Sequence, residues 1–247
     1  REIAGAEASV AEQKLARENA LDARAARNLV AYVKEELAAT GAVPSDKALV
    51  IERFVDEIGD TRVCVLSPFG ARVHAPWATA ILAQLRARQA GEIEAVWSDD
   101  GMVFRVPAAD EPPPLDAFFP ASEEIERVVT EQLAHTALFA ARFRENAARA
   151  LLLPRKHPGK RTPLWMQRKR ASDLLSVASE FPSFPIVLET YRECLRDVFD
   201  MPALVDLLRK VETRRVRAIP IESERPSPFA SGGSSNSAMR CGNSAIR

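Results

Sequence analysis

Residues 48–69 read ALVIERFVDEIGDTRVCVLSPF, and this stretch decides the fold. The runs at 48–54 and 61–69 are rich in β-branched and aromatic residues, and the acidic segment between them carries Gly59. Two such runs joined by a short segment with a glycine are typical of an antiparallel hairpin. We therefore expect a β-hairpin here, as the centre of an antiparallel or mixed sheet.

Further elements extend this sheet region. Residues 92–97 and 102–106 predict short strands on either side of the sequence SDDG at 98–101, whose Asp-Gly pair is a strong signal for a tight turn. Apolar residues on one side of the stretch 76–89 predict a helix between the two hairpins. The run VRAIPIE at 216–222 predicts one more short strand.

Helices are expected on both sides of this region. Apolar residues recur every fourth position over 21–38, which is the period of an amphipathic helix. The proline-rich stretch at 108–121 cannot form a regular helix. Four later stretches predict helices: 122–150, 163–180, 184–199 and 202–212. Residues from 226 onward show no apolar period, and we expect them to be disordered.

Together these elements predict an α+β protein. A small mixed or antiparallel sheet over about 48–106, with the strand near 216–222, accompanies a helical bundle over about 122–213. The predicted parts are a helical lead-in at 1–45, an α/β part at 46–107, a proline-rich loop at 108–121, a helical part at 122–222 and a disordered tail at 223–247.

Composition excludes several classes of protein. The 247 residues include 34 basic and 34 acidic ones, so no net charge draws the chain to nucleic acid or to a membrane. No run of about 18 apolar residues is present to span a membrane. Three widely spaced cysteines form neither a disulfide framework nor a four-cysteine zinc site, and they fit a reducing cytosol. The chain begins at Arg1 without a signal peptide, and we interpret it as a fragment of a longer cytoplasmic protein.

Charge is nevertheless segregated along the chain. Residues 142–170 carry one acidic residue, Glu145, and ten basic ones: Arg142, Arg144, Arg149, Arg155, Lys156, Lys160, Arg161, Arg168, Lys169 and Arg170. The centre of this stretch, PRKHPGKRTPLW at 154–165, reads as a loop that enters a helix, and such a loop suits phosphate oxygens. An exposed Trp165 beside these cations is a stacking platform for an unpaired base. The alternative is a solvated basic face with Trp165 in the core, and charge alone does not decide between the two.

Other candidate sites have simpler structural interpretations. The three histidines show no metal-ligand spacing. Asp99 and Asp100 resemble a paired-carboxylate acid/base site, but the tight turn accounts for them. Cys194 shares a face with apolar helix residues, which favours a buried thiol. The glycine-rich phosphate-binding motif is missing, so we expect no ATP binding, no catalytic residue, no cofactor and no metal site in this chain.

Five segments in order resemble one known family. They are ERFVDEIGDTRVCVLSPFGARVHAPWA (52–78), WSDDGMVFRVP (97–107), LFAARFRENAARALLLPRKHPGKRTPLWMQRKRASDLL (138–175), FPSFPIVLETYRECLRDVFDMPAL (181–204) and RPSPFAS (225–231). The chain resembles the Lhr family of bacterial ATP-dependent DNA helicases over roughly residues 15–231. The similar part of that family follows the two RecA-like motor domains and comprises the end of the winged-helix region and the helicase-associated domain.

The resemblance implies a 3′-to-5′ superfamily 2 translocase that tracks along single-stranded DNA and unwinds duplexes, RNA:DNA hybrids included. It places ATP and Mg²⁺ in the motor domains, so this chain is expected to be inactive alone. The implied partners are single-stranded DNA or an RNA:DNA hybrid and the motor domains of the same polypeptide, with a role in DNA repair and no membrane.

The resemblance also implies particular contacts. Trp165 matches the family's base-stacking tryptophan, and Met102, after SDDG, is a further base contact. The remaining implied nucleic-acid-binding residues are basic: Lys160, Arg161, Arg155, Lys156 and Arg168. The alternative is a structural module that packs on the motor domains without binding DNA by itself. A base-excising enzyme is disfavoured because no convincing acid/base pair is present.

Overall fold

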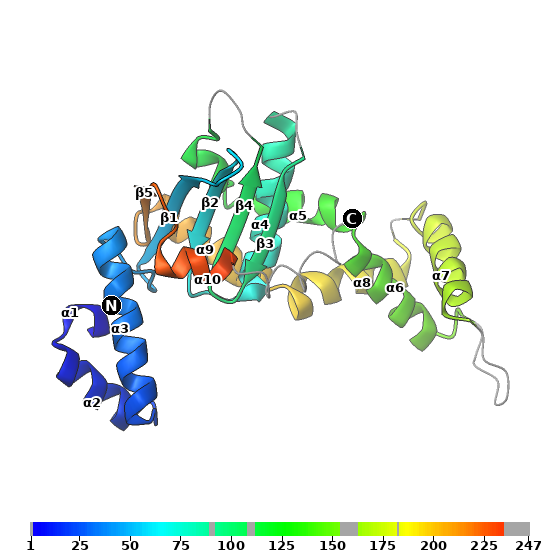
Figure 1. Ribbon diagram of the computed structural model, residues 1–247. Coiled ribbons are helices and arrows are strands. Elements are labelled where there is room, and N and C mark those ends of the chain that lie inside the picture. The colour runs from blue at the N-terminus through cyan, green and yellow to red at the C-terminus, as the bar shows by residue number, and fades with distance from the viewer. Residues whose placement is uncertain (1, 89–91, 108–111, 154–162, 182, 235–247) are drawn as a thin grey trace.

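The computed structural model describes residues 2–88, 92–107, 112–153, 163–181 and 183–234, and it is an α+β protein built on one five-stranded sheet (Figure 1). The strands are β1 (Ala48–Val55), β2 (Thr61–Leu66), β3 (Glu94–Ser98), β4 (Gly101–Val106) and β5 (Arg217–Glu222). Their order across the sheet is β3-β4-β2-β1-β5, and only the β1–β5 pair is parallel. The predicted mixed sheet and both predicted hairpins are therefore confirmed.

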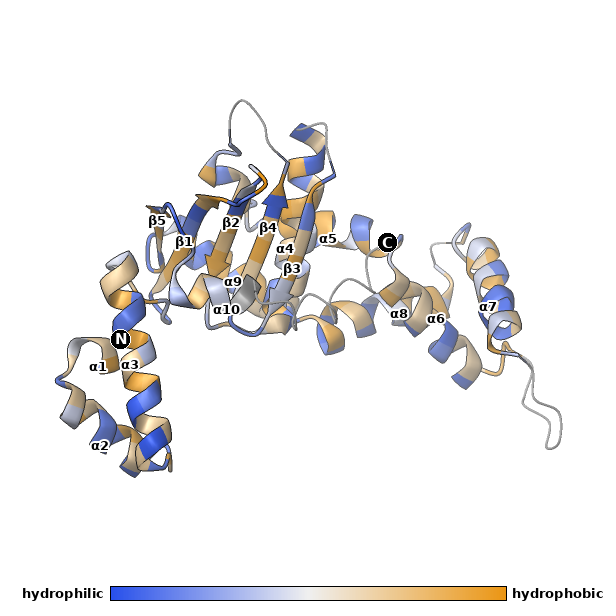
Figure 2. Ribbon diagram, viewed as in Figure 1, coloured by the Kyte–Doolittle hydropathy of each residue, from blue (hydrophilic) through white to orange (hydrophobic). Residues whose placement is uncertain are grey.

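Successive side chains of a strand point to opposite faces of the sheet, so each strand contributes to both faces. Apolar residues are buried on each face. Leu49, Ile51 and Phe104 point to one face, which packs against helix α4 (Ala71–Arg88). Val50 and Cys64 point to the other face, which the short helix α10 (Pro228–Ser234) covers. Figure 2 shows hydrophobic residues running through the central strands.

Helix α4 begins five residues earlier than the sequence predicts, and Pro76 lies inside it. Proline has no N–H to give to the carbonyl one turn earlier, which here belongs to Arg72. The backbone N–H of Asp200 donates to that carbonyl instead, over 3.0 Å. A distant segment thus satisfies the group that Pro76 leaves free, and no local pattern contains this information.

The helices after residue 122 form two groups. Helices α5 (Ile125–Leu133) and α9 (Met201–Glu212) pack near α4 beside the 3₁₀ turn η1 (Leu115–Phe118). Helices α6 (Ala137–Arg149), α7 (Leu164–Ala178) and α8 (Pro185–Glu193) form a lobe that extends to one side, and we call these three helices the lobe (Figure 1).

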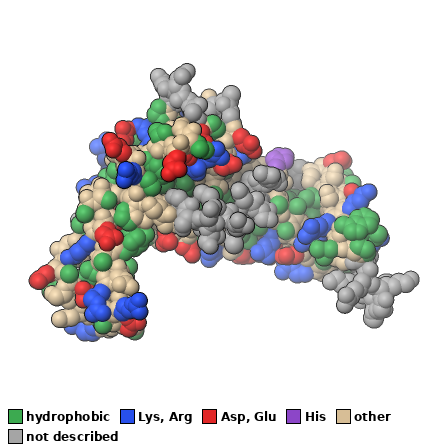
Figure 3. Space-filling view, viewed as in Figure 1, with side chains coloured by type: hydrophobic (Ala, Val, Ile, Leu, Met, Phe, Trp, Pro, Cys, Tyr) green, Lys and Arg blue, Asp and Glu red, His purple; other side chains and the backbone are tan. Residues whose placement is uncertain are grey.

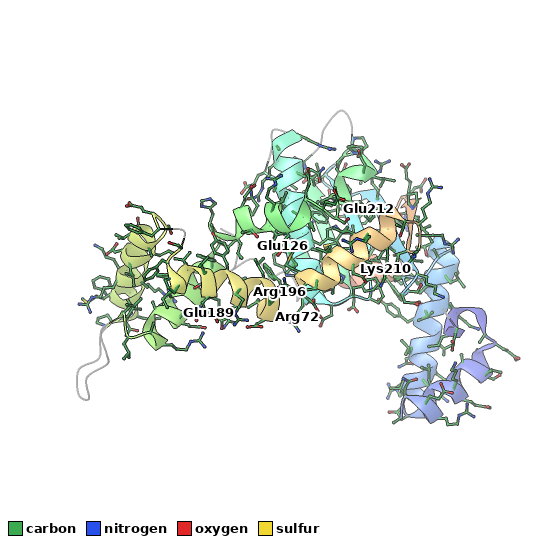
Figure 4. The ribbon with its side chains drawn as sticks, turned by 180° about the vertical axis from the view of Figure 1, so that it is seen from behind. Arg72, Glu126, Glu189, Arg196, Lys210 and Glu212 are labelled. Carbon is green, nitrogen blue, oxygen red and sulfur yellow. The ribbon has the colours of Figure 1, made fainter. Side chains whose placement is uncertain are left out.

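Two of the expected helices are interrupted. The stretch 122–150 divides before α6, where Thr136 accepts a hydrogen bond from the N–H of Phe139 and caps the new helix. The stretch 184–199 continues beyond α8 as the π-helix η2 (Cys194–Val198). At this junction Arg72 Nη2 donates to the carbonyl of Arg196 over 3.1 Å, and Figure 4 shows the two residues close together.

The N-terminal residues form an arm of three helices, α1 (Glu2–Gly5), α2 (Ala8–Glu18) and α3 (Ala23–Thr40). Residues 1–19 lack an apolar stripe of their own, yet Ala11 and Leu15 of α2 pack on Ala26 and Val30 of α3. Asp22 caps α3 by accepting from two backbone N–H groups. The arm projects away from the sheet on the side opposite the lobe (Figure 1).

Part of the predicted disordered tail is ordered. Helix α10 lies within it because two fully buried carboxylates hold the segment. Glu52 accepts from Ser223 Oγ and from the N–H of Ser227, both over 2.8 Å, and Glu36 accepts from the N–H of Phe229 over 2.9 Å. Residues 235–247 lie outside the described residues.

We predict that Gly101→Ala destabilises the chain more than Gly59→Ala. Both glycines have positive φ, +153° and +89°. An added Cβ has open space at Gly59, where the cost is backbone strain of about 1–2 kcal/mol. At Gly101 it would lie 2.4 Å from the carbonyl oxygen of Val65, so β2 or the turn must also shift. Urea unfolding measures both losses, and equal losses would contradict the structure.

We predict that Glu36→Gln becomes more stabilising, relative to the native chain, as pH rises from about 4 to about 8. Burial raises the pKa of Glu36. A carboxyl with a raised pKa in the folded state contributes full stability below its unfolded pKa and loses it as pH rises through the folded pKa. Glutamine keeps the acceptor for Phe229 without the buried charge. Melting temperatures of the native chain and of Glu36→Gln, measured across this pH range, test the prediction. Glu35→Gln, on the exposed side of α3, is the control. A difference in melting temperature between Glu36→Gln and the native chain that does not change with pH would contradict the prediction.

Candidate nucleic-acid interface

Trp165 lies at the start of α7, immediately after Pro163 and Leu164, and its side chain is 63% exposed. The first turn forms there because Pro163 supplies its carbonyl to the N–H groups of Met166 and Gln167. The core interpretation of Trp165 is therefore wrong for this structure. An indole that projects into solvent from the end of a helix is free to stack on a planar ligand.

Exposed cations follow Trp165 on the same helix. Arg168, Lys169 and Arg170 are exposed, and none of them forms an ion pair with another described residue. Figure 3 shows hydrophobic and basic side chains next to each other at this end of the molecule. The described part of α7 thus combines an apolar stacking surface with unneutralised positive charge.

Not all the basic residues of 142–170 are available in this way. Arg142 pairs with Glu145 over 2.9 Å, and Arg149 pairs with Glu193 over 3.1 Å. Arg155, Lys156, Lys160 and Arg161 lie outside the described residues. The structure therefore brings Trp165 and Arg168 together on one helix and leaves the loop residues of the predicted site as predictions.

Met102 is placed differently. It lies on β4 opposite Trp97 of β3, its side chain is 1% exposed, and it packs in the core between the sheet and α4. Its contact with a base stays a prediction, and its burial in the core gives it a packing role in this structure.

The SDDG turn is held by helix α4. Asp99 accepts a hydrogen bond from the N–H of Ala71 over 2.9 Å, so its carboxylate caps the helix. His74 Nδ1 lies 2.7 Å from the carbonyl of Ser98, and Nε2 lies 2.9 Å from Ser67 Oγ. Because a carbonyl only accepts, Nδ1 carries the proton and Nε2 accepts from Ser67. Burial lowers the pKa of His74 and favours this neutral form. These contacts support the turn interpretation over an acid/base site.

The remaining candidates have structural roles. Cys64 and Cys194 are buried free thiols, and burial raises the pKa of each to about 12. Among the described residues, no cluster of three or more histidine, cysteine or acidic side chains is suited to a metal ion. Within the same residues, every helix is too short or too polar to cross a membrane.

An apolar groove of about 530 Å³ lies between α3, the β3–β4 turn and α10. Tyr32, Val96, Val103 and Phe229 contribute to its lining. Sequence reasoning did not find it, because its walls come from segments that are far apart in the chain and that meet only in the folded state.

Comparison with known proteins agrees with this architecture. Residues 43–230 match the family described as DEAD/H associated, and the chain belongs to that family. It is 53% identical over 204 residues to the Lhr helicase/probable uracil glycosylase of Mycolicibacterium smegmatis, covering 82% of this chain and 14% of that protein. It is 48% identical over 204 residues to the Lhr helicase/uracil glycosylase of Escherichia coli, covering 82% of this chain and 13% of that protein.

A solved structure is also similar. The structure of Mycobacterium smegmatis helicase Lhr bound to ssDNA and AMP-PNP matches with a TM-score of 0.84 and 48% identity, covering 94% of this chain and 29% of that chain. The resemblance to Lhr helicases drawn from the sequence is thus confirmed. The chain spans 14% and 13% of the length of the two curated relatives, so it corresponds to one region of such a protein.

Proposed function

We propose that this chain is the non-motor portion of an Lhr-type, 3′-to-5′ ATP-dependent DNA helicase that contacts the single strand. The observation that carries the proposal is the exposed Trp165 on the same helix as Arg168, Lys169 and Arg170, none of which forms an ion pair with another residue that the structure describes. The similar structure, that of Mycobacterium smegmatis helicase Lhr bound to ssDNA and AMP-PNP, supports it.

The physical basis of this contact is stacking combined with local charge. A base that stacks on an aromatic side chain gains roughly 1–3 kcal/mol, and the gain tolerates any sequence because every base has a π-face. Phosphates that meet the neighbouring cations release counterions, which makes binding sensitive to salt. The chain is neutral overall, so this attraction is confined to the basic region rather than spread over the molecule.

We assign ATP and Mg²⁺ to motor domains of the parent polypeptide, because the sequence of this chain lacks the phosphate-binding glycine motif. RNA:DNA hybrids as further substrates, a role in repair and a cytoplasmic location belong to the same proposal. The chain alone then binds the single strand without hydrolysing ATP.

A second candidate function is a module that packs on the motor domains without binding DNA by itself. Val177 of α7, Leu188 of α8 and Phe181 in the segment between these two helices favour it, since these apolar residues are each more than half exposed. Large apolar side chains left in solvent are suited to a contact with another protein part.

We predict that Trp165→Ala weakens binding of a fluorescent single-stranded oligonucleotide by roughly 5- to 150-fold, the equivalent of one lost stack. Fluorescence anisotropy measures the affinity. Val177→Ala, which removes another exposed apolar side chain of the same helix, is the matched control and leaves the affinity unchanged. Absence of binding by the folded native chain would reject DNA contact in favour of the packing module.

Replacing Arg168, Lys169 and Arg170 together by glutamine is predicted to reduce the salt dependence of binding. Each lost phosphate contact lowers the slope of log affinity against log salt by about 0.7 for a single strand. Replacing Arg142 and Glu145 together by glutamine is the comparison, because their charges neutralise each other in one ion pair. An unchanged slope in the first variant would place the phosphate contacts elsewhere.

A further inference from the structure

A buried polar cluster joins α6 to α8 within an otherwise apolar interface. Asn146 is only 4% exposed, and Phe143, Ala147 and Val187 around it are buried apolar residues. Its amide Nδ2 donates to Thr190 Oγ1 over 3.1 Å and to Glu193 Oε2 over 2.9 Å. Its Oδ1 accepts from the guanidinium of Arg149. Both ends of the amide are therefore occupied.

This cluster permits one register of α6 on α8. Apolar contacts alone tolerate a shift of one turn, because similar side chains follow each other along both helices. A shift would take the buried Nδ2 of Asn146 away from both of its acceptors on α8, whereas Thr190 would keep its bond to the Ile186 carbonyl within α8, and an unpaired buried donor is costly. Polar residues buried in helix interfaces select register in this way.

The cluster also holds the end of α8 and the last turn of α6. Burial raises the pKa of Glu193, but hydrogen bonds from Asn146 and Arg149 outweigh it and the pKa lies below its usual value. The Glu193 carboxylate is therefore ionised at neutral pH and pairs with Arg149. Glu193 is the last residue of α8, directly before the π-helix η2, and Arg149 is the last residue of α6.

The position of α7 depends on this interface. Helix α7 packs mainly on α6, and its buried residues are the two small ones, Ala171 and Ala178. Leu174 and Leu175 are partly buried against the core, but no large side chain of α7 is fully buried, so α6 is the main support of α7. Any change in how α6 lies on α8 is thus passed to α7 and to Trp165 at its start.

We infer that Asn146 is a positioning residue: it locks α6 onto α8 and thereby fixes where Trp165 is presented to a nucleic acid. The effect on DNA binding rests on the proposed function. The effect on the position of Trp165 does not depend on it. Asn146 does not touch the ligand, and it acts through α6 and α7.

The test exchanges donor and acceptor within the cluster. In Asn146→Asp the new carboxylate faces that of Glu193, so the hydrogen bond is lost and the two charges repel. In the double variant Asn146→Asp/Glu193→Gln, the glutamine amide donates to the aspartate and the contact returns with its roles reversed. Arg149 keeps an acceptor in both. Gln132→Glu, exposed on α5, controls for the added negative charge.

We predict that Asn146→Asp weakens single-strand binding about 3- to 10-fold and that the double variant recovers most of the loss, as expected for directly coupled residues. Trp165 emission and its anisotropy, obtained by subtracting spectra of matched Trp165→Phe chains, change in the single variant and return in the double one. Thr190→Val, a nearly isosteric change that removes one acceptor, gives a smaller effect of the same kind and serves if Asn146→Asp does not fold.

The outcomes separate the two ideas. Unchanged Trp165 anisotropy and affinity in Asn146→Asp, or in Thr190→Val, would overturn the positioning role. A double variant that folds but does not recover would also overturn it. If Trp165 anisotropy follows the cluster while Trp165→Ala leaves DNA affinity unchanged, positioning of the indole stands and stacking on DNA is rejected.

Discussion

The parallel pairing of β1 with β5 is the contact on which the rest of the architecture depends. Residues Ala48–Arg53 pair with Arg217–Glu222, so every helix from α4 to α9 is contained in the connection between two neighbouring strands. The apolar face of the sheet packs against α4, with α5 and α9 beside it, while α6 to α8 extend outward as the lobe. The same pairing returns the chain to Glu52, whose buried carboxylate then holds α10 on the opposite face.

The candidate interface is formed by the basic side chains of the lobe that have no acidic partner among the described residues, together with Trp165. Ion pairs within the lobe neutralise Arg142 and Arg149, whereas α7 carries its cations without acidic partners among the described residues. Helix α7 also has few buried residues, so its apolar Trp165 stays in solvent. The exposed indole contributes little to the stability of the core. An exposed aromatic ring near basic side chains is suited to contact with a ligand.

The sequence predicted correctly the elements that depend on neighbouring residues, and it failed where an element depends on a contact between distant residues. The hairpins were predictable because alternation and the SDDG turn are local signals, and the structure confirms both. The predicted start of α4 was wrong. The turn before Pro76 is helical because the N–H of Asp200, far away in the sequence, donates to the Arg72 carbonyl that the proline leaves free. The prediction that residues 228–234 are disordered was wrong as well. These residues form α10, and the two carboxylates that hold it, Glu36 and Glu52, lie far away in the sequence. Burial of Met102 depends on which face of β4 meets α4.

The sequence by itself determined the α+β class, the strands, most helices, the family and the concentration of positive charge around Trp165, because each depends on neighbouring residues or on long matching motifs. Only the tertiary structure decided which arginines are neutralised, that Trp165 is exposed and that Asn146 joins α6 to α8. The physical reason is that an ion pair, a buried amide and an exposed surface are properties of residues brought together across the fold. No local pattern records those partners.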